Sequence, residues 1–287
     1  MLEVVIPIVG AKLLKYLGVF QENQERVLIN YVLYFSLPIL AFEAGYSIKN
    51  TANILKISAV AWACILVSML CAYFLSKLLK LDVKSKKTFL LISSFGNTAF
   101  LGYPYAYSYF GQEGLQIAII YDNIGSFLLV SSLGILIASG KPNLKEVIFF
   151  PPFLGLILGF VSKGLALNTK VLSLLGSSTL PVVLFALGLS LNLGGIKKNI
   201  RVSLIAIFVK VSVGLFVSLL MGKVLNLPEL ELKVSVLESA MPPMMFSAVL
   251  AMKYNLNPSL AFASVGLGII LSFFYVPVLV KYCGGGI

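Results

Sequence analysis

Four ionisable residues stand inside long apolar stretches of the chain, namely Glu43, Asp122, Lys210 and Glu238. A charged side chain inside a bilayer costs about 2.5–3.5 kcal/mol on insertion scales, so each needs a partner or a function. Lys210 lies about ten residues inside its stretch, roughly 15 Å at the helical rise, and its side chain is too short to reach water. We expect Lys210 to pair with a carboxylate, first of all Asp122, or with an anionic substrate. A purely structural Lys–Asp pair is the alternative.

Two apolar stretches contain motifs that would interrupt a helix. The first reads GNTAFLGYP, from Gly96 to Pro104, and the second reads ESAMPP, from Glu238 to Pro243. A proline lacks an N–H and clashes with the carbonyl four residues earlier, so Pro104 would free the carbonyl of Phe100. Unpaired main chain in a membrane is tolerated only against protein or a watery cavity. The two motifs therefore predict a binding site near the middle of the membrane.

The predicted site combines these interruptions with polar groups of neighbouring stretches. Freed carbonyls favour cations, while the N-termini of half-helices favour anions. Asn97 and Asn123 would add neutral hydrogen bonds, although polar packing between helices explains either one almost as well. Glu43 lies near the end of its stretch and is expected at the interface. The candidate substrate-binding residues are Asn97, Gly102, Pro104, Asp122, Asn123, Lys210, Glu238, Pro242 and Pro243.

The composition is that of a membrane protein. Of 287 residues, 59% are hydrophobic and 11% charged, and the mean hydropathy is +0.99. Soluble domains are about 45–50% apolar and about 25% charged, so a water-soluble enzyme and a nucleic-acid-binding module are excluded despite the net charge of +11. The chain has no histidine, which excludes Ser–His and Cys–His catalysis and histidine-ligated zinc. We expect no enzymatic activity, no cofactor and no metal site.

Ten stretches are apolar enough to cross a bilayer as helices, each of which needs about 20 residues. The alternating pattern of a β-barrel is absent, so the sequence predicts an all-α polytopic membrane protein. Lys and Arg are about twice as numerous in and beside the loops that follow the odd-numbered stretches as they are on the opposite side. This bias predicts a multi-pass protein of the cell (inner or plasma) membrane with both termini outside. The predicted spans are residues 2–19, 27–47, 54–79, 88–110, 115–138, 147–164, 172–193, 200–225, 233–253 and 259–281.

The two halves of the chain share a sequence motif. SLPILAFEAGYSI begins at Ser36 and TLPVVLFALGLSL begins at Thr179, and the two align without a gap at matching Leu, Pro, Phe, Gly and Ser. Each half then holds five spans, and because five is odd the second copy must be inverted. Inverted repeats are typical of secondary transporters. We predict two inverted five-helix repeats, residues 1–140 and 141–287, with broken crossover helices at the fourth and ninth spans.

These motifs resemble those of the auxin efflux carrier family. GNTAFLGYP resembles its G-N-x-x-F-x-G-x-P segment and SLPILAF its L-P-x-L-x-F signature, while ESAMPP and a lysine in the middle of the eighth span also follow its pattern. The resemblance covers essentially the whole chain. It implies a ten-helix fold of two inverted repeats, shared in outline with bile acid symporters and sodium/proton antiporters. It also implies that Asn97, Pro104, Pro242 and Pro243 line the crossover.

Two features depart from the family pattern. The loop between the fifth and sixth spans, about Ser139 to Glu146, is short, unlike the long cytosolic loop of many plant members. This length is similar to that of prokaryotic members. The segment VSVGLFV after Lys210 also lacks a proline associated with the family.

The resemblance implies an organic anion as substrate: auxin in plants, and dicarboxylates such as malate or malonate in some bacteria. We expect a secondary active transporter of a small carboxylate that works by alternating access, with H⁺ as the coupling ion. A sodium-coupled symporter of the bile acid type is the alternative. A passive anion channel and, last, an intramembrane enzyme are alternatives of other classes. The expected partners are the substrate anion, the lipid bilayer and a second copy of the chain in a homodimer.

Overall fold

The computed structural model describes residues 2–21, 24–47, 53–141, 149–191 and 196–284. These ranges are helical and contain no strand; one isolated β-bridge joins Gly96 and Pro243. Six helical stretches are long and apolar enough to cross a membrane, and a shorter apolar helix covers Pro151–Val161. The predicted class, an all-α polytopic membrane protein, is therefore confirmed.

The elements follow one another along the chain as α-helices and short π-helical segments, the latter marked η. They are α1 (Leu2–Tyr16), α2 (Glu25–Tyr31), η1 (Val32–Ser36), α3 (Leu37–Ser47), α4 (Ile54–Leu78), α5 (Val83–Ser94), η2 (Thr98–Gly102), α6 (Tyr103–Ile120), η3 (Tyr121–Ser126), α7 (Phe127–Leu129), η4 (Val130–Gly134), α8 (Ile135–Ser139), α10 (Pro151–Val161), α11 (Lys170–Ser177), α12 (Thr179–Ser190), α13 (Ile196–Val224), α14 (Glu229–Ser239), α15 (Met245–Lys253) and α16 (Pro258–Gly284).

The described helices overlap the ten predicted spans, and six of the described stretches are long and apolar enough to cross a membrane, so the number ten stays a prediction. The ninth span begins at Glu229 rather than at residue 233, and two further differences lie in the first half. The fourth span begins at Val83 rather than at residue 88, because Asp82 caps the helix there. The part of the fourth span that follows its interruption joins the fifth span in one helical stretch, Thr98–Ser139, which bends at Gly111, where φ is +64°. Glycine has no Cβ and adopts positive φ readily, so the chain can turn sharply at Gly111 without a long loop. The loop predicted between the fifth and sixth spans lies largely outside the described residues.

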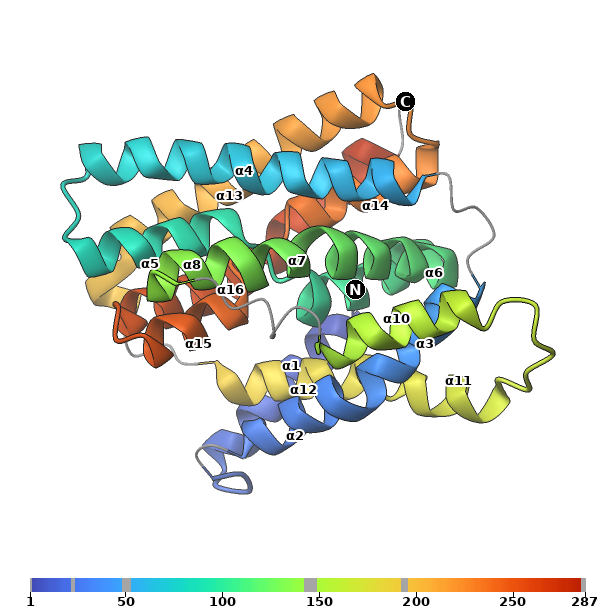
Figure 1. The fold of residues 1–287 in the computed structure, drawn as a ribbon. Helices are drawn as coiled ribbons and strands as arrows, with labels where there is room; N and C mark the ends of the chain where they lie inside the picture. The colour runs from blue at the N-terminus through green and yellow to red at the C-terminus, as the bar shows by residue number, and fades with distance from the viewer. Residues whose placement is uncertain (1, 22–23, 48–52, 142–148, 192–195, 285–287) are drawn as a thin grey trace.

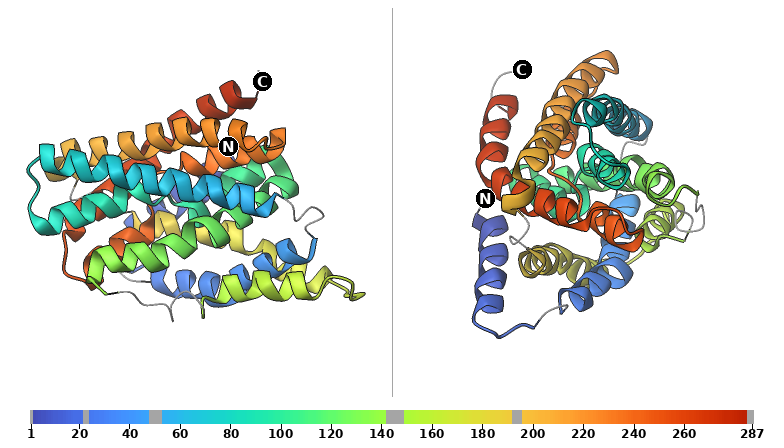
Figure 2. Two further views of the ribbon diagram at one scale, coloured as in Figure 1. Left: turned by 45° about the horizontal axis from the view of Figure 1, so that its top comes forward. Right: turned by 90° about the vertical axis from the view of Figure 1, so that its left-hand side faces the viewer.

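The helices pack into two groups (Figures 1 and 2). The scaffold group consists of α1–α3 with η1 and α10–α12, in which α3 packs on α10 and α1 packs on α12. The crossover group consists of α4–α8 with η2–η4 and α13–α16, in which α13 packs on both α4 and α16. Contacts of α12 with η2, and of α1 and α3 with α6, join the two groups.

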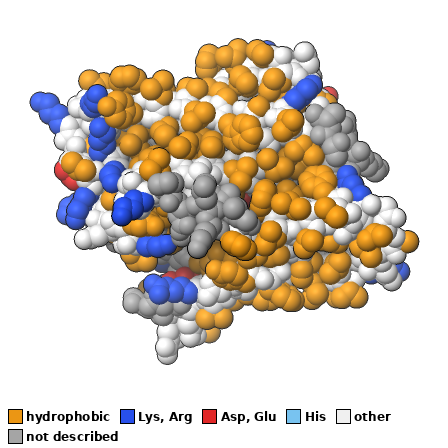
Figure 3. Space-filling model, viewed as in Figure 1, with side chains coloured by type: hydrophobic (Ala, Val, Ile, Leu, Met, Phe, Trp, Pro, Cys, Tyr) orange, Lys and Arg blue, Asp and Glu red, His pale blue; other side chains and the backbone are white. Residues whose placement is uncertain are grey.

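The outer surface is apolar over the middle of the molecule, as expected for a chain that faces lipid. Figure 3 shows apolar side chains over most of one face, with Lys and Arg gathered mainly at the end where α4 meets α5. Phe208 and Phe216 of α13 are each 70% exposed. A continuous apolar surface of this extent is unfavourable in water and favourable in a bilayer.

Glycines allow α3 and α10 to pack backbone against backbone. A Cβ on Gly155 would lie 2.2 Å from the carbonyl oxygen of Pro38, and a Cβ on Gly159 would lie 2.1 Å from that of Phe42. From the other side, a Cβ on Gly45 would lie 2.3 Å from the carbonyl oxygen of Leu156. Small residues four apart are a common basis of helix association in membranes, where van der Waals contact replaces the hydrophobic effect.

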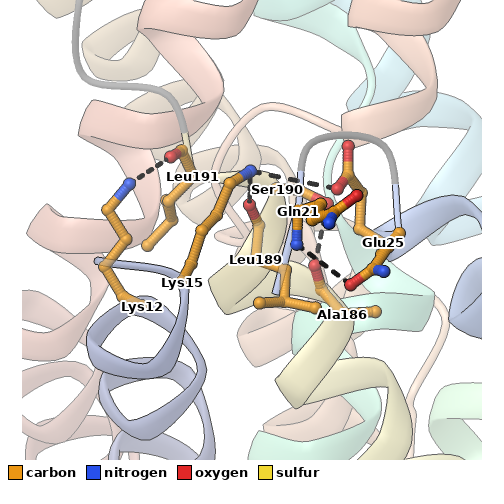
Figure 4. Close-up of polar contacts among 9 residues, drawn as sticks. Lys12, Lys15, Gln21, Glu25, Ala186, Leu189, Ser190 and Leu191 are labelled. Carbon is orange, nitrogen blue, oxygen red and sulfur yellow. Dashed lines mark hydrogen bonds and ion pairs between the residues drawn. The ribbon is translucent and has the colours of Figure 1, made fainter. Parts of the chain in front are cut away.

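Two lysines of α1 satisfy the C-terminal carbonyls of α12 (Figure 4). The ammonium of Lys12 donates to the carbonyl of Leu191 and that of Lys15 to the carbonyl of Leu189, each at 2.7 Å. Lys15 also lies 3.9 Å from the carboxylate of Glu25. The last carbonyls of a helix have no partner within the helix and carry partial negative charge, so these ammonium groups stabilise the end of α12.

Replacing Asp82 with alanine should destabilise the start of α5 by about 1 kcal/mol, because its carboxylate accepts hydrogen bonds from the N–H groups of Lys84 and Ser85. Hydrogen bonds from Ser85 lower the pKa of this carboxyl group. Its stabilising effect is therefore present above the unfolded pKa of about 3.9 and is lost as the pH falls through the lower folded value.

Thermal unfolding of the purified protein tests this cap. Asp82→Ala should unfold at a lower temperature than wild type at neutral pH, and the difference should shrink in strong acid. Asp82→Asn keeps an oxygen acceptor without a charge and serves as the control. Equal unfolding temperatures of Asp82→Ala and wild type at neutral pH would contradict the prediction.

Candidate functional site at the crossing of two interrupted helices

The two predicted helix interruptions lie side by side and hydrogen-bond to each other. The N–H of Asn97 donates to the carbonyl of Pro242 at 2.8 Å, and the N–H of Met244 donates to the carbonyl of Phe95 at 3.0 Å. Gly96 stands opposite Pro243 in this antiparallel pairing. Each interruption therefore supplies main-chain partners to the other, as a buried segment without helical hydrogen bonds requires.

The sequence indicated a helix break at Pro104. In the structure, the first interruption is instead at Gly96 and Asn97. Phe95 has extended backbone angles and Asn97 has φ −81° and ψ 60°, after which the helical stretch resumes. Pro104 is the second residue of α6, which begins directly after the π-helical segment η2, and the wider turn of η2 lets the helical stretch continue through the proline. The carbonyl of Asn97 accepts the N–H groups of Leu101 and Gly102 and so begins this stretch.

A cavity of about 690 Å³ lies beside the crossing. Asn97 and Asp122 of the predicted site line it, together with Ser131 and, at the end of α15, Lys253. Most of its wall is apolar, and the residues that contribute include Leu33, Phe100, Phe127, Phe150, Met245 and Phe246. The amide nitrogen of Asn97 is buried without a hydrogen-bond partner among the described residues. The cavity therefore combines a polar end at the crossing with a large apolar wall.

Asp122 and Asn123 belong to one buried network. The carboxylate of Asp122 accepts hydrogen bonds from the hydroxyl of Thr98 and, at 2.9 Å, from that of Tyr103. The amide nitrogen of Asn123 donates to the hydroxyl of Tyr103 and to the carbonyl of Ile119, each at 3.0 Å. The carbonyl oxygen of the Asn123 side chain has no partner in the described chain. Both oxygens of Asp122 are thus engaged by hydroxyl groups of the protein.

Lys210 does not form an ion pair with Asp122, so the prediction of this pair is wrong. Its ammonium group donates instead to the carbonyl of Ser239, one of the carbonyls that the proline pair leaves without a helical N–H. The ion pairs among the described residues are Lys15–Glu25 and Lys233–Glu229. Asp122 already accepts hydrogen bonds from hydroxyl groups and does not need Lys210. The ammonium group of Lys210 instead stabilises the main-chain carbonyl that is left without a helical partner at the end of α14. Lys210 also packs against Gly96, where a Cβ would lie 3.1 Å from Nζ.

Glu238 and Gly102 contact each other away from the cavity. Glu238 is fully buried, and neither of its carboxyl oxygens has a hydrogen-bond partner among the described residues. A Cβ on Gly102 would lie 2.2 Å from Oε2 of Glu238, so the carboxyl group lies directly on the backbone of η2. Of the nine predicted site residues, the structure therefore places Asn97 and Asp122 in the lining of the cavity and Glu238 and Gly102 in contact with each other outside it.

The other predicted residues have distinct places. Pro242 and Pro243 pair with the first interruption, and Gly268 of α16 packs against both, since a Cβ there would lie 2.7 Å from Cβ of Pro242. Pro104 lines a second cavity, of about 290 Å³, together with the half-buried Glu43. These two residues therefore line a different cavity from Asn97.

Thr98 and Tyr103, the two residues that hydrogen-bond to Asp122, were not among the site residues predicted from the sequence. Both lie within the GNTAFLGYP motif, but hydroxyl-bearing residues are too common in membrane helices to be singled out by type. Ser131 was missed for the same reason. Lys253 served only as an indicator of topology, although it lines the larger cavity.

Two interrupted helices that cross within a polytopic bundle, beside a cavity, are the arrangement of a membrane transport protein. Residues 1–147 and 140–280 each match the membrane transport protein family. The chain belongs to this family, that of the auxin efflux carriers.

Two archaeal proteins are similar to the chain over most of their lengths. An uncharacterized transporter of Methanocaldococcus jannaschii is 32% identical over 268 residues, which cover 88% of this chain and 87% of that protein. An uncharacterized transporter of Methanothermobacter thermautotrophicus is 27% identical over 288 residues, which cover 96% of this chain and 95% of that protein.

Proposed function

We propose that the protein is a secondary active transporter whose substrate is a small organic anion, bound by its carboxylate beside the crossing of the interrupted helices. The observation that carries the proposal is the cavity of about 690 Å³ at this crossing, lined by Asn97, whose amide nitrogen is buried without a hydrogen-bond partner among the described residues. A buried donor without an acceptor is costly, so a ligand oxygen there would gain a hydrogen bond at little cost.

The polar end of the cavity suits an anion. Met245 and Phe246, in the first turn of α15, line the cavity. The first N–H groups of a helix have no partner within it and carry partial positive charge, which favours a carboxylate. Lys253, at the other end of α15, adds a positive charge to the lining of the cavity. Asp122 does not compete for these donors, because Thr98 and Tyr103 engage its oxygens.

The remaining wall suits an apolar body rather than a second carboxylate. Phe100, Phe127 and Phe150 contribute aromatic rings to this wall. The rings of Phe127 and Phe150 are stacked, with 3.5 Å between their centroids. A second carboxylate placed among these rings would lose its hydration without gaining donors. Among small carboxylates, we therefore favour a monocarboxylate with an apolar or aromatic body over a dicarboxylate such as malonate.

Alternating access would come from rocking of the crossover group against the scaffold group. Residues of both groups line the larger cavity, and residues of both groups also line the smaller cavity, which includes Pro104. The inverted repeat would supply two equivalent states. One observation supports such a repeat: residues with positive φ occur at corresponding turns of the two halves, namely Lys80 after α4 and Asn226 after α13.

Uptake into liposomes that contain the purified protein tests the proposal. Labelled phenylacetate should enter faster than into protein-free liposomes, with a rate that saturates, and malonate should compete weakly. A rate that rises linearly with concentration would favour a passive channel. Varying the pH and the sodium concentration separately distinguishes proton from sodium coupling.

Replacing Asn97 with aspartate should reduce phenylacetate uptake by more than about tenfold, which corresponds to about 1.4 kcal/mol of lost binding. The substitution preserves the shape of the side chain but places a negative charge where the carboxylate would bind. Asn168→Asp, in an exposed turn, is the matched control, because its oxygen still accepts the N–H of Lys170. Unchanged uptake by Asn97→Asp would remove Asn97 from the site.

A further inference from the structure

Glu238 is unusual among the buried ionisable side chains. Within the described ranges, it alone has both carboxyl oxygens buried without a hydrogen-bond partner, and its exposed fraction is 0%. Asp122, by contrast, is buried with a hydroxyl donor at each oxygen. A negative charge without donors or a paired cation is very costly in a dry interior, so burial of this kind favours the neutral carboxylic acid.

The surroundings of Glu238 suit a proton better than a metal ion. The carboxyl group lies directly against Gly102, and Glu238 lines neither of the two cavities described above. A metal ion at the carboxyl group would need space and several further oxygen ligands. A proton needs neither. Because Glu238 is fully buried, water reaches the group only when a packed neighbour moves, and η2 is in direct contact with it through Gly102.

The charges around Glu238 connect it to the cavity. The ammonium of Lys210 and the carboxylate of Asp122 both lie within electrostatic range of it. When Glu238 is neutral, the charges of Lys210 and Asp122 balance. When Glu238 is ionised, the region has a net negative charge beside a cavity that would receive an anion. The titratable groups within electrostatic range of Glu238 are Lys210 of α13, Asp122 and Tyr121 of η3 and Tyr103 of α6. Further out, Cys64 of α4 lies near Lys210 and Tyr121, and Tyr275 of α16 donates to the carbonyl of Ala240.

We propose that Glu238 binds the proton that is coupled to transport. An O–H bond forms on its carboxyl group from water on one side of the membrane, and the proton leaves to water on the other side when η2 and α14 separate there. The proton and the anion favour each other's binding, because the proton removes the negative charge that repels the anion, and this coupling is reciprocal. The proposal rests on the function proposed above and assigns its coupling ion.

Titration calorimetry with phenylacetate between about pH 6 and about pH 9 tests the coupling. In wild type, affinity should weaken as the pH rises, approaching tenfold per unit where Glu238 ionises in the free protein. Glu238→Gln imitates the neutral acid, so its affinity should stay high and independent of pH. Glu229→Gln, an exposed position on the same helix, should behave as wild type. A pH-dependent Glu238→Gln variant, or a wild type whose affinity follows sodium and not pH, would overturn the proposal.

Infrared spectroscopy of the purified protein without ligand provides a measurement that does not depend on transport. The carboxylic acid C=O stretch should be present in wild type and in Glu229→Gln, and weaker in Glu238→Gln by the contribution of one group. An unchanged band in Glu238→Gln would mean that Glu238 is ionised and would overturn the proposal. If phenylacetate and malonate both fail to bind, the proposed function fails, while the infrared band still decides the protonation of Glu238. If Glu238→Gln fails to fold, the pH dependence of wild type alone decides the coupling.

Discussion

Replacing Gly214 with alanine should reduce phenylacetate transport by more than about tenfold, equivalent to about 1.4 kcal/mol. Gly214 of α13 packs against the end of α14, where a Cβ would lie 2.2 Å from the carbonyl oxygen of Ser239. Lys210 donates to this same oxygen. The added methyl group must therefore displace the main chain that leads into the second interruption. This displacement weakens the hydrogen bond from Lys210 to the carbonyl of Ser239, which holds that main chain in place.

Both stability and transport should respond to this substitution. Overpacking of this kind costs typically about 1–3 kcal/mol, so thermal unfolding should begin at a lower temperature. Gly10→Ala in α1 is the matched control, because no atom lies within 4 Å of the added Cβ, and it should leave both properties unchanged or raise stability slightly. Uptake per reconstituted molecule separates lost activity from lost protein. Wild-type uptake by Gly214→Ala would show that α13 and α14 can move apart without harm to the crossing.

Replacing Gly159 with leucine should prevent stable packing of α10 on α3. A Cβ at this position would lie 2.1 Å from the carbonyl oxygen of Phe42 and 2.8 Å from the amide nitrogen of Tyr46. Main-chain atoms cannot rotate away as the end of a side chain can. The two helices must therefore separate and lose the close contacts that Gly45 and Gly155 also maintain.

The expected result is a large loss of monodisperse protein in detergent, with a lower unfolding temperature for what remains. Size-exclusion chromatography and thermal unfolding measure both. Gly10→Leu, which adds the same side chain to α1 where no atom lies within 4 Å of the added Cβ, is the matched control. Normal yield and stability of Gly159→Leu would mean that α3 and α10 pack less closely than the structure indicates.

The sequence alone was sufficient for the protein class and for locating the second interruption. Apolar length and the lack of charge determine whether a segment enters a bilayer, and both are local properties. The adjacent Pro242 and Pro243 interrupt a helix wherever they stand, because a proline removes a donor and clashes with its own helix. Pro104 was misleading, since the π-helical segment before it carries the proline and the break falls at Gly96 and Asn97.

Only the tertiary structure decided which groups meet. Lys210 binds the carbonyl of Ser239 rather than Asp122, and Glu238 lies against Gly102. These partners are distant in sequence, and a buried charge can be satisfied by main chain as well as by an opposite charge, so residue types do not determine the pairing. The size of the cavity likewise depends on how the two helix groups pack. The sequence thus determined that the helices must break, and the packing determined what each break holds.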